Sequence, residues 1–330
     1  MKDKGDMEDK GNKLLYYSSH SPHPSHSPSP HLPTSPYKLM SSATKLRDLL
    51  KSPGIMIIPG VYDCLGAKLV EKLGFNVVAT SGFGIAASTL GLPDYGFLTA
   101  TEMLYSVGRI ARSISIPLIA DMDTGYGNVL NVIRTVQDAV QLGLAGIILE
   151  DQEWPKKCGH FEGKQVIPMK EHVGKIQAAV QARGESSLVI IARTDARAPL
   201  GLEEAMRRGR AYLEAGADVL FVEAPQSVEE LQTIASNFGD VPLVANIVEG
   251  GKTPSLSASE LEKLGFKIVF FPLTALLAVT KVMTACLSQL KEQGTTANFR
   301  ELVNFQDFQE LMGVPKYWQI EQQFGIEKGE

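Results

Sequence analysis

In this chain of 330 residues, the residue types best suited to chemistry are a pair of aspartates and a cysteine in a polar loop further along the sequence. Asp121 and Asp123 stand two residues apart, directly after the apolar run Ile116–Ala120. Carboxylates at the end of a buried strand supply the hard oxygen ligands that Mg²⁺ prefers. Asn128 follows on a glycine-bearing loop, where it can cap a helix over residues 129–142. An isolated pair of this kind is usually only an acidic strand end, but here the same construction recurs along the chain.

The second candidate is the polar loop that contains Cys158. Lys156, Lys157 and His160 flank the thiol, and a positive field of this kind favours the thiolate and eases proton exchange near neutral pH. Gly159 allows the backbone to fold closely beside the thiol. We therefore expect Cys158 to be a reactive group rather than a small buried side chain.

The elements that must position these residues form a repeated pattern after Thr44, in which an apolar run ends on a polar residue and a helical segment leads to the next run. Four of the helical segments end on a glycine, which is typical of a helix C-terminus. Runs that are apolar throughout indicate parallel strands covered on both faces. The predicted strands are residues 54–59, 75–80, 116–120, 144–149, 188–192, 217–222, 242–245 and 266–271.

Alternating strands and helices fit either a closed barrel or an open doubly wound sheet. Eight units within about 250 residues favour an α/β fold of the (β/α)₈ TIM-barrel type, and no G-x-G-x-x-G follows the first strand. In a barrel the carboxyl ends of all strands face one mouth. That mouth would gather Ser81, Asp121, Asp123, Glu150, Arg193, Glu223 and Asn246.

Composition narrows the class of protein further. We expect a disordered N-terminal extension over residues 1–40, rich in Ser, Pro and His, a catalytic barrel over 41–290 and a helical tail over 291–330. The formal charge of −5 gives no basic footprint for nucleic acid, and no apolar stretch is long enough to span a bilayer. Three scattered cysteines favour a reduced, cytoplasmic setting.

These residues form a pattern that resembles the isocitrate lyase/phosphoenolpyruvate mutase superfamily, and most closely its methylisocitrate lyase and petal-death-type alkylmalate lyase branch. The resemblance extends from Thr44 to Phe324 and implies a barrel whose eighth helix, in the segment after Pro272, is swapped between the subunits of a homotetramer built as a dimer of dimers. It rests on Ser81-Gly82, Leu92-Pro93-Asp94, Asp121-x-Asp123, Lys156-Lys157-Cys158-Gly159-His160, Arg193-Thr194-Asp195 and Asn246.

The resemblance also implies a role for each site residue. Asp121 and Asp123 would hold Mg²⁺, or Mn²⁺ as a substitute, partly through water and with Glu150 and Asp94 in the outer shell. The metal would hold an α-oxocarboxylate or its enolate. Cys158 would protonate the leaving carbanion, in a catalytic group with Lys156, His160, Arg193 and Glu223. The substrate would be bound by Ser81, by the backbone of Gly82, Phe83 and Gly159, and by Arg193 and Asn246.

Departures from the family pattern bear on the substrate. Methylisocitrate lyases carry a threonine and an arginine where this chain has Val248 and Leu277, so a third carboxylate would be costly to bury. We therefore expect a Mg²⁺-dependent carbon–carbon lyase of retro-aldol or Claisen type, acting on a 2-hydroxy dicarboxylate such as an alkylmalate and releasing pyruvate or glyoxylate. The alternatives are a carboxyvinyl-carboxyphosphonate phosphorylmutase, a methylisocitrate lyase, an oxaloacetate hydrolase, which Pro272 disfavours, and a sensor that only binds an α-oxo acid.

Overall fold

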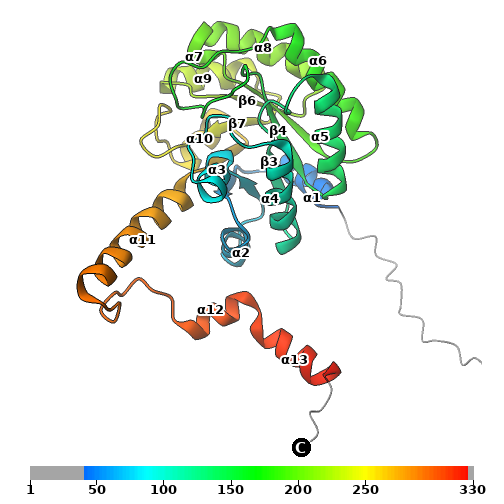
Figure 1. Cartoon of the computed structure of the whole chain (residues 1–330). Helices are drawn as coiled ribbons and strands as arrows, with labels where there is room; N and C mark the ends of the chain where they lie inside the picture. The colour runs from blue at the N-terminus through cyan, green and yellow to red at the C-terminus, as the bar shows by residue number, and fades with distance from the viewer. Residues whose placement is uncertain (1–40, 326–330) are drawn as a thin grey trace, which may run out of the picture. The chain divides into compact units, whose positions relative to one another are not determined.

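Eight parallel strands form a closed barrel in chain order, which confirms the (β/α)₈ prediction (Figure 1). The computed structural model describes residues 41–325, so the predicted disorder of residues 1–40 lies outside the described residues. The strands are β1 (Met56–Val61), β2 (Val78–Thr80), β3 (Leu118–Asp121), β4 (Gly146–Glu150), β5 (Val189–Thr194), β6 (Val219–Val222), β7 (Leu243–Asn246) and β8 (Ile268–Phe271).

All eight predicted strands exist, but most begin and end later than expected. The second strand begins at Val78 instead of Phe75, and the fifth continues through Thr194. Asp121 and Glu150 are consequently the last residues of their strands rather than the first residues beyond them. The backbone ladder therefore fixes the positions of these polar residues directly.

Capping residues set the ends of several helices between the strands. Asn128 caps α5 with a reciprocal capping box, as predicted, and Gly265 ends α10 with φ 106°, a left-handed conformation that favours glycine. The helices of the barrel are α1 (Ser42–Lys51), α2 (Cys64–Lys72), α3 (Gly82–Leu90), α4 (Ala100–Ser113), α5 (Val129–Gln141), α6 (Met169–Arg183), α7 (Arg197–Leu200), α8 (Leu202–Glu214), α9 (Val228–Asn237) and α10 (Ala258–Leu264).

The core has two layers, because the strands are apolar on both faces. Ile119, Phe221 and Phe270 pack inside the barrel, whereas Ala120 and Leu220 pack between the strands and the surrounding helices. The barrel interior is therefore filled by side chains, and the hollow that remains is at the carboxyl end of the strands.

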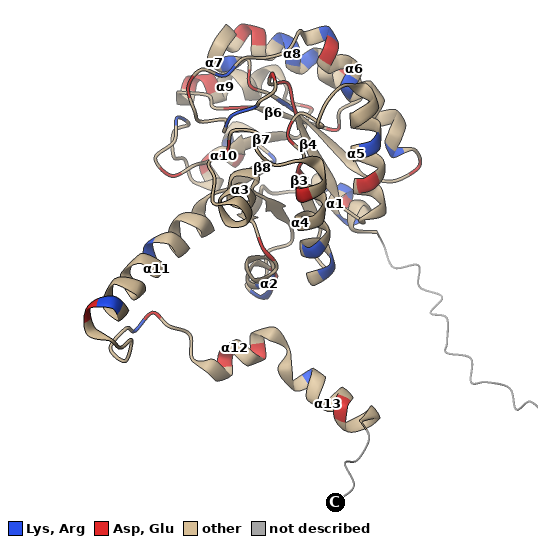
Figure 2. Cartoon of the chain, in the orientation of Figure 1, with Lys and Arg blue, Asp and Glu red and all other residues tan. Residues whose placement is uncertain are grey.

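Three further helices follow β8: α11 (Thr274–Gln293), α12 (Phe305–Met312) and α13 (Val314–Phe324). None of them contains a buried residue. Figure 2 shows that Lys, Arg, Asp and Glu occupy few positions on α11, mostly near its end. The predicted boundary between barrel and tail at residue 290 falls inside α11 and stays a prediction. Over residues 41–325, no helix is both long and apolar enough to cross a membrane.

Candidate active site

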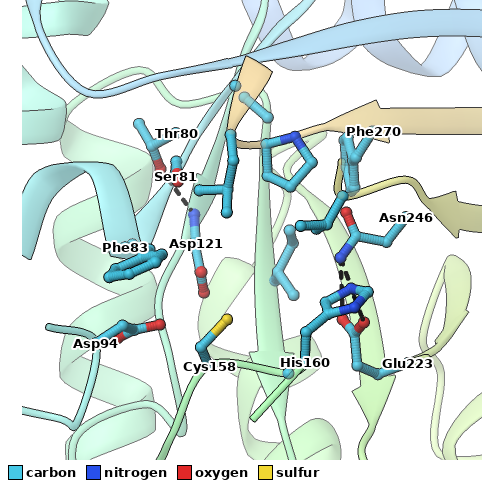
Figure 3. A pocket seen from close by; sticks show the side chains of 18 of the residues that line it. Thr80, Ser81, Phe83, Asp94, Asp121, Cys158, His160, Glu223, Asn246 and Phe270 are labelled. Carbon is cyan, nitrogen blue, oxygen red and sulfur yellow. Dashed lines mark hydrogen bonds and ion pairs between the residues drawn. The ribbon is translucent and has the colours of Figure 1, made fainter. Parts of the chain in front are cut away.

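A cavity of about 60 Å³ lies at the carboxyl end of the strands (Figure 3). Most of the predicted site residues line it, whereas Asp123, Glu150 and Lys156 lie outside its lining. The predicted residues in the lining are Ser81, Gly82, Phe83, Asp94, Asp121, Cys158, Gly159, His160, Arg193, Glu223 and Asn246. The strand order thus brings together side chains that are up to 165 residues apart in the sequence, from Ser81 to Asn246.

The N-terminus of α3 forms one wall of the cavity. Ser81 caps this helix, and its side chain accepts a hydrogen bond from the backbone N–H of Gly84 at 3.1 Å. The first N–H groups of a helix have no acceptor within it and are favourable for an anion. At Gly82, an added Cβ would lie 2.9 Å from Asp121 Oδ2, so only glycine lets the helix approach this carboxylate so closely.

Asp123 is buried beside other carboxylates. Its Oδ1 lies 2.7 Å from Nζ of Lys156, and its Oδ2 has no hydrogen-bond partner among the described residues. Burial, together with the neighbouring Asp121 and Asp94, raises the pKa of Asp123 to about 7, although Lys156 opposes this shift. Lys156 also lies 2.6 Å from Asp94 Oδ1, so its ammonium is the main counter-charge of this acidic cluster.

The acidic cluster fits a divalent cation that is coordinated partly through water. Within residues 41–325 there is no group of three or more His, Cys, Asp or Glu side chains arranged to hold a metal ion. However, Oδ1 of Asp121 accepts a hydrogen bond from the backbone N–H of Asp123 at 3.1 Å, which holds the two residues close together, and the unpartnered Oδ2 of Asp123 is available as a ligand. Mg²⁺ usually keeps several waters and needs only one or two carboxylates from the protein.

Arg193 is the centre of a second charged cluster. Its guanidinium donates to Asp195 at 2.8 and 3.0 Å, and lies 3.3 Å from Glu150 and 3.4 Å from Glu223. Burial opposes the charge, but these three carboxylates raise the pKa of Arg193 well above its usual range. Burial also raises the pKa of Glu150 well above its usual range, even beside Arg193. Glu150 thus lies beside Arg193, and its backbone N–H also donates to the carbonyl of Asp123 at 2.9 Å, so its place in an outer metal shell stays a prediction.

Glu223 links the strand ends to the cysteine loop. Nε2 of His160 lies 3.2 Å from Oε1 of Glu223, and the amide of Asn246 donates to both carboxylate oxygens at 3.3 Å. Burial favours the neutral acid, but Arg193 and His160 outweigh it and lower the pKa of Glu223 to about 2. Nδ1 of His160 accepts a hydrogen bond from the backbone N–H of Lys252, which fixes the ring between two elements.

The expectation of a thiolate at Cys158 is wrong. Burial, together with Asp94 and Glu223, raises the pKa of Cys158 to about 11. The flanking cations act elsewhere, since Lys156 pairs with Asp94 and Asp123 and the ammonium of Lys157 donates to the carbonyl of Gly163. Figure 3 shows the Cys158 side chain between Asp94 and His160. The structure therefore presents a protonated thiol to the cavity, which is the form that donates a proton.

Sequence reasoning assigned no role to Asp195 or to Lys164. Asp195 belongs to the Arg-Thr-Asp motif and directly follows β5, and a carboxylate two residues after Arg193 at the end of a predicted strand is a usable signal. Lys164 has no such signal, because its contacts with Gly159 and Asp195 arise only from the way the loop folds.

Val248 and Leu277 have different positions relative to the cavity. Val248 lines it, as do Ala79, Pro272 and Leu273. Leu277, by contrast, lies in the first turn of α11 and is 44% exposed, so it does not close the cavity of its own chain as expected.

Comparison with known proteins agrees with this geometry. The profile of the family described as phosphoenolpyruvate phosphomutase matches residues 46–291. The chain is 44% identical over 286 residues to 2,3-dimethylmalate lyase of Eubacterium barkeri, covering 86% of this chain and 99% of that protein. It is 42% identical over 283 residues to the petal death protein of Dianthus caryophyllus, covering 85% and 89%.

A solved structure of phosphonopyruvate hydrolase in complex with oxalate and Mg²⁺ superposes with a TM-score of 0.78 at 32% identity, covering 86% of this chain and 99% of that one. The family prediction is thereby confirmed: this chain belongs to the phosphoenolpyruvate mutase/isocitrate lyase superfamily.

Proposed function

We propose that this chain is a carbon–carbon lyase that cleaves a 2-hydroxy dicarboxylate of the alkylmalate class into an α-oxo acid, pyruvate or glyoxylate, and a second carboxylic acid. The observation that carries this proposal is the position of the Cys158 thiol, whose pKa burial raises, in the same cavity as Ser81 and Arg193, which could bind carboxylates. Carbon–carbon cleavage leaves a carbanion that needs a proton, whereas a binding protein needs no proton donor.

The oxo-acid half of the substrate would lie against the N-terminus of α3. Ser81 and the backbone N–H groups of Gly82 and Phe83 offer donors to its carboxylate. Arg193 and Asn246 approach from the opposite strands and would orient the other carboxylate. Because these donors are fixed before substrate arrives, they stabilise charge where it develops at little reorganisation cost.

The bond-breaking step uses one proton donor and one acceptor. Transfer of the hydroxyl proton to the ionised carboxylate of Glu223, which lines the cavity, lets the C2–C3 bond break. C2 then becomes the carbonyl of the oxo acid, and the bonding electron pair passes to C3. The thiol of Cys158 then delivers its proton to C3. A thiol of raised pKa is poised for this role, because it stays protonated until a stronger base forms beside it.

Asp121 and Asp123 would hold Mg²⁺, with Mn²⁺ as a substitute, and the cation would polarise the oxygen atoms of the oxo-acid half. Support comes from the unpartnered Oδ2 of Asp123 and from the relative whose structure contains Mg²⁺ and oxalate. Lys156 lies between Asp94 and Asp123, and its ammonium would balance part of the negative charge of these two side chains.

The lining favours a dicarboxylate with alkyl substituents over a tricarboxylate. Ile58, Val248 and Phe270 give the cavity an apolar side. Arg193 is the only arginine or lysine among the described residues that line it. A third carboxylate would therefore be buried without a counter-charge, which is costly.

The test is a screen for released pyruvate and glyoxylate over 2-alkylmalates, 2,3-dimethylmalate, 2-methylisocitrate, isocitrate and oxaloacetate, with and without Mg²⁺. On the best substrate, Cys158→Ser should lower kcat by about 10²–10⁴-fold, the usual contribution of a general acid. Binding of Mg²⁺ and pyruvate should survive. A mutant within a few-fold of the unaltered enzyme would remove Cys158 as the proton donor.

A phosphonomutase is the second candidate, because the family profile that matches residues 46–291 is described by that activity. A mutase moves a phosphoryl or carboxyl group and needs no proton at carbon from this loop. Turnover of a phosphonate substrate that is indifferent to Cys158→Ser would favour the mutase over the lyase.

We also propose that the enzyme is a cytoplasmic homotetramer in which α11 is exchanged between subunits. Supporting features are the unpaired thiols of Cys64, Cys158 and Cys286, and the absence of buried residues from α11. Met283 and Leu287 are 54% and 56% exposed on this helix, and apolar surface of that extent usually contacts protein.

A further inference from the structure

Lys164 is a charged residue buried at the end of the cysteine loop, and the proposed reaction does not yet use it. Its ammonium donates to the carbonyl oxygen of Gly159, the residue after Cys158, and to Oδ1 of Asp195 at 2.6 Å. The side chains of Lys164 and Asp195 are both completely buried. A lysine ammonium is rarely placed in such a position unless its partners satisfy it.

Asp195 connects this lysine to the substrate-binding arginine. One of its oxygens accepts from Nε of Arg193 at 2.8 Å, and Oδ1, which Lys164 contacts, also accepts from Nη2 at 3.0 Å. The backbone N–H of Asp195 is held in turn by Asp151 at 2.8 Å. Lys164 and Arg193 thus share one rigidly placed carboxylate.

Gly159 brings the loop against the same cluster. An added Cβ at Gly159 would lie 2.5 Å from Nη2 of Arg193 and 2.6 Å from the carboxyl carbon of Glu223. The loop therefore lies directly over Arg193. The hydrogen bond from Lys164 to the Gly159 carbonyl is a buried polar contact at this point, in addition to that of His160 with Glu223.

We propose that Lys164 is a positioning residue that holds the Cys158 loop closed over Arg193 through the shared carboxylate of Asp195. Its consequence for catalysis rests on the proposed function, in which Cys158 donates the proton and Arg193 orients the substrate. Closure of the loop itself does not depend on what the enzyme cleaves. Without Lys164, Asp195 would keep only Arg193 as a cationic partner, and the Gly159 carbonyl would lose its donor.

Lys252, in the connection between β7 and α10, provides a matched control because it contacts the same cysteine loop. Its ammonium pairs with Glu162 at 2.5 Å, but the Glu162 side chain is 88% exposed. The contact of Lys252 with His160 is made by the backbone, so a change of its side chain leaves that hydrogen bond in place. The two lysines therefore tie one loop to the barrel from a buried and from an exposed position.

The experiment compares Lys164→Met and Lys252→Met in the full-length enzyme. Iodoacetamide is added at pH 8, and the alkylation rates of Cys158 and Cys64 are followed by peptide mass mapping. We expect Lys164→Met to alkylate Cys158 at least tenfold faster than the unaltered enzyme while Cys64, on α2, is unchanged. Lys252→Met should stay within twofold at both cysteines.

Alkylation needs no turnover, so it tests closure even if none of the screened acids is cleaved. If the lyase is active, kcat of Lys164→Met should also fall at least tenfold. The proposal would be overturned if Cys158 in Lys164→Met were alkylated no faster than in the unaltered enzyme. It would also be overturned if alkylation of Cys64 were accelerated equally, because the whole fold would then be less stable. Should Lys164→Met fail to fold, Lys164→Gln, which removes the charge but keeps a polar side chain, is judged by the same two rates, and failure of both variants to fold also overturns it.

Discussion

The mouth of the barrel buries charged side chains, whereas helix α11 exposes apolar ones. At the mouth, Arg193, Asp195 and Glu223 are removed from water although all are charged. On α11, Met283 and Leu287 remain more than half exposed although both are apolar. Within one chain, the region with charged groups is enclosed and the region with apolar groups is open.

Each of the two regions would be stabilised by a different kind of binding partner. Buried charges are unfavourable unless they are paired, and the unpartnered Oδ2 of Asp123 marks where pairing is incomplete. Exposed apolar surface is unfavourable until another protein surface covers it. A cation and a carboxylate substrate would complete the mouth, and a second subunit would complete α11.

The largest expected effect on activity comes from replacing Asp123, the carboxylate with an unpartnered oxygen. Asp123→Ala should abolish Mg²⁺-dependent turnover and most of the Mg²⁺ affinity while the barrel stays folded, because it deletes a metal ligand and also a buried charge of raised pKa. Titration calorimetry and circular dichroism measure the two properties. Asp138→Ala, on α5 beside the exposed Arg134, is the control and should change neither. Undiminished Mg²⁺ affinity in Asp123→Ala would remove the metal assignment.

The positions of the polar strand ends could be predicted because each apolar run stops on them. Their protonation could not, because it depends on contacts made across the barrel. Cys158 shows this well: its sequence neighbours are cations, but its spatial neighbours include Asp94 and Glu223 and its burial dominates. Leu277 shows the converse, since the family pattern placed it at the pocket, whereas in this chain it lies on the exposed α11.

A smaller effect is expected on substrate selectivity, measured as the ratio of kcat/KM for a dicarboxylate and a tricarboxylate. If the apolar side at Val248 excludes a third carboxylate, 2-methylisocitrate should show a kcat/KM roughly 10²-fold below that of 2,3-dimethylmalate, the scale expected for an unpaired buried charge. Val248→Thr should narrow this gap, since it adds a hydroxyl donor. Equal kcat/KM values for the two acids would restore methylisocitrate lyase as the better description.

The apolar side chains of α11 are either covered by a second subunit or exposed to water in the native enzyme. A charge introduced on this helix should distinguish the two. Leu287→Asp should shift the assembly toward smaller species and lower the melting temperature, because it places a carboxylate in an apolar surface that the proposed exchange would cover. Ser288→Asp, at the neighbouring exposed position, should change neither. Light scattering coupled to size-exclusion chromatography measures the assembly. If α11 faces water in the native enzyme, Leu287→Asp will behave as Ser288→Asp does.

The smallest effect concerns a buried polar group at the mouth that no ligand would relieve. His172, on α6, is buried against Tyr212 with ring centroids 4.6 Å apart, and neither ring nitrogen has a hydrogen-bond partner among the described residues. Burial, assisted by Lys175 and Arg208, lowers the pKa of His172 to about 3. The unfolded chain takes up this proton below its ordinary pKa of 6.5, whereas the folded protein does not. The free energy of unfolding must therefore fall as the pH drops from 6.5 toward 3.

At pH 5 this amounts to about 2 kcal/mol, since each pKa unit corresponds to about 1.4 kcal/mol. His172→Phe keeps an aromatic ring against Tyr212 but cannot be protonated, so its stability should fall by that much less between pH 7 and pH 5. Urea denaturation at the two pH values, without and with Mg²⁺, measures the difference. An equal loss in both proteins would show that folding does not lower the pKa of His172. A loss that Mg²⁺ abolishes would instead assign the acid sensitivity to the carboxylates of the mouth.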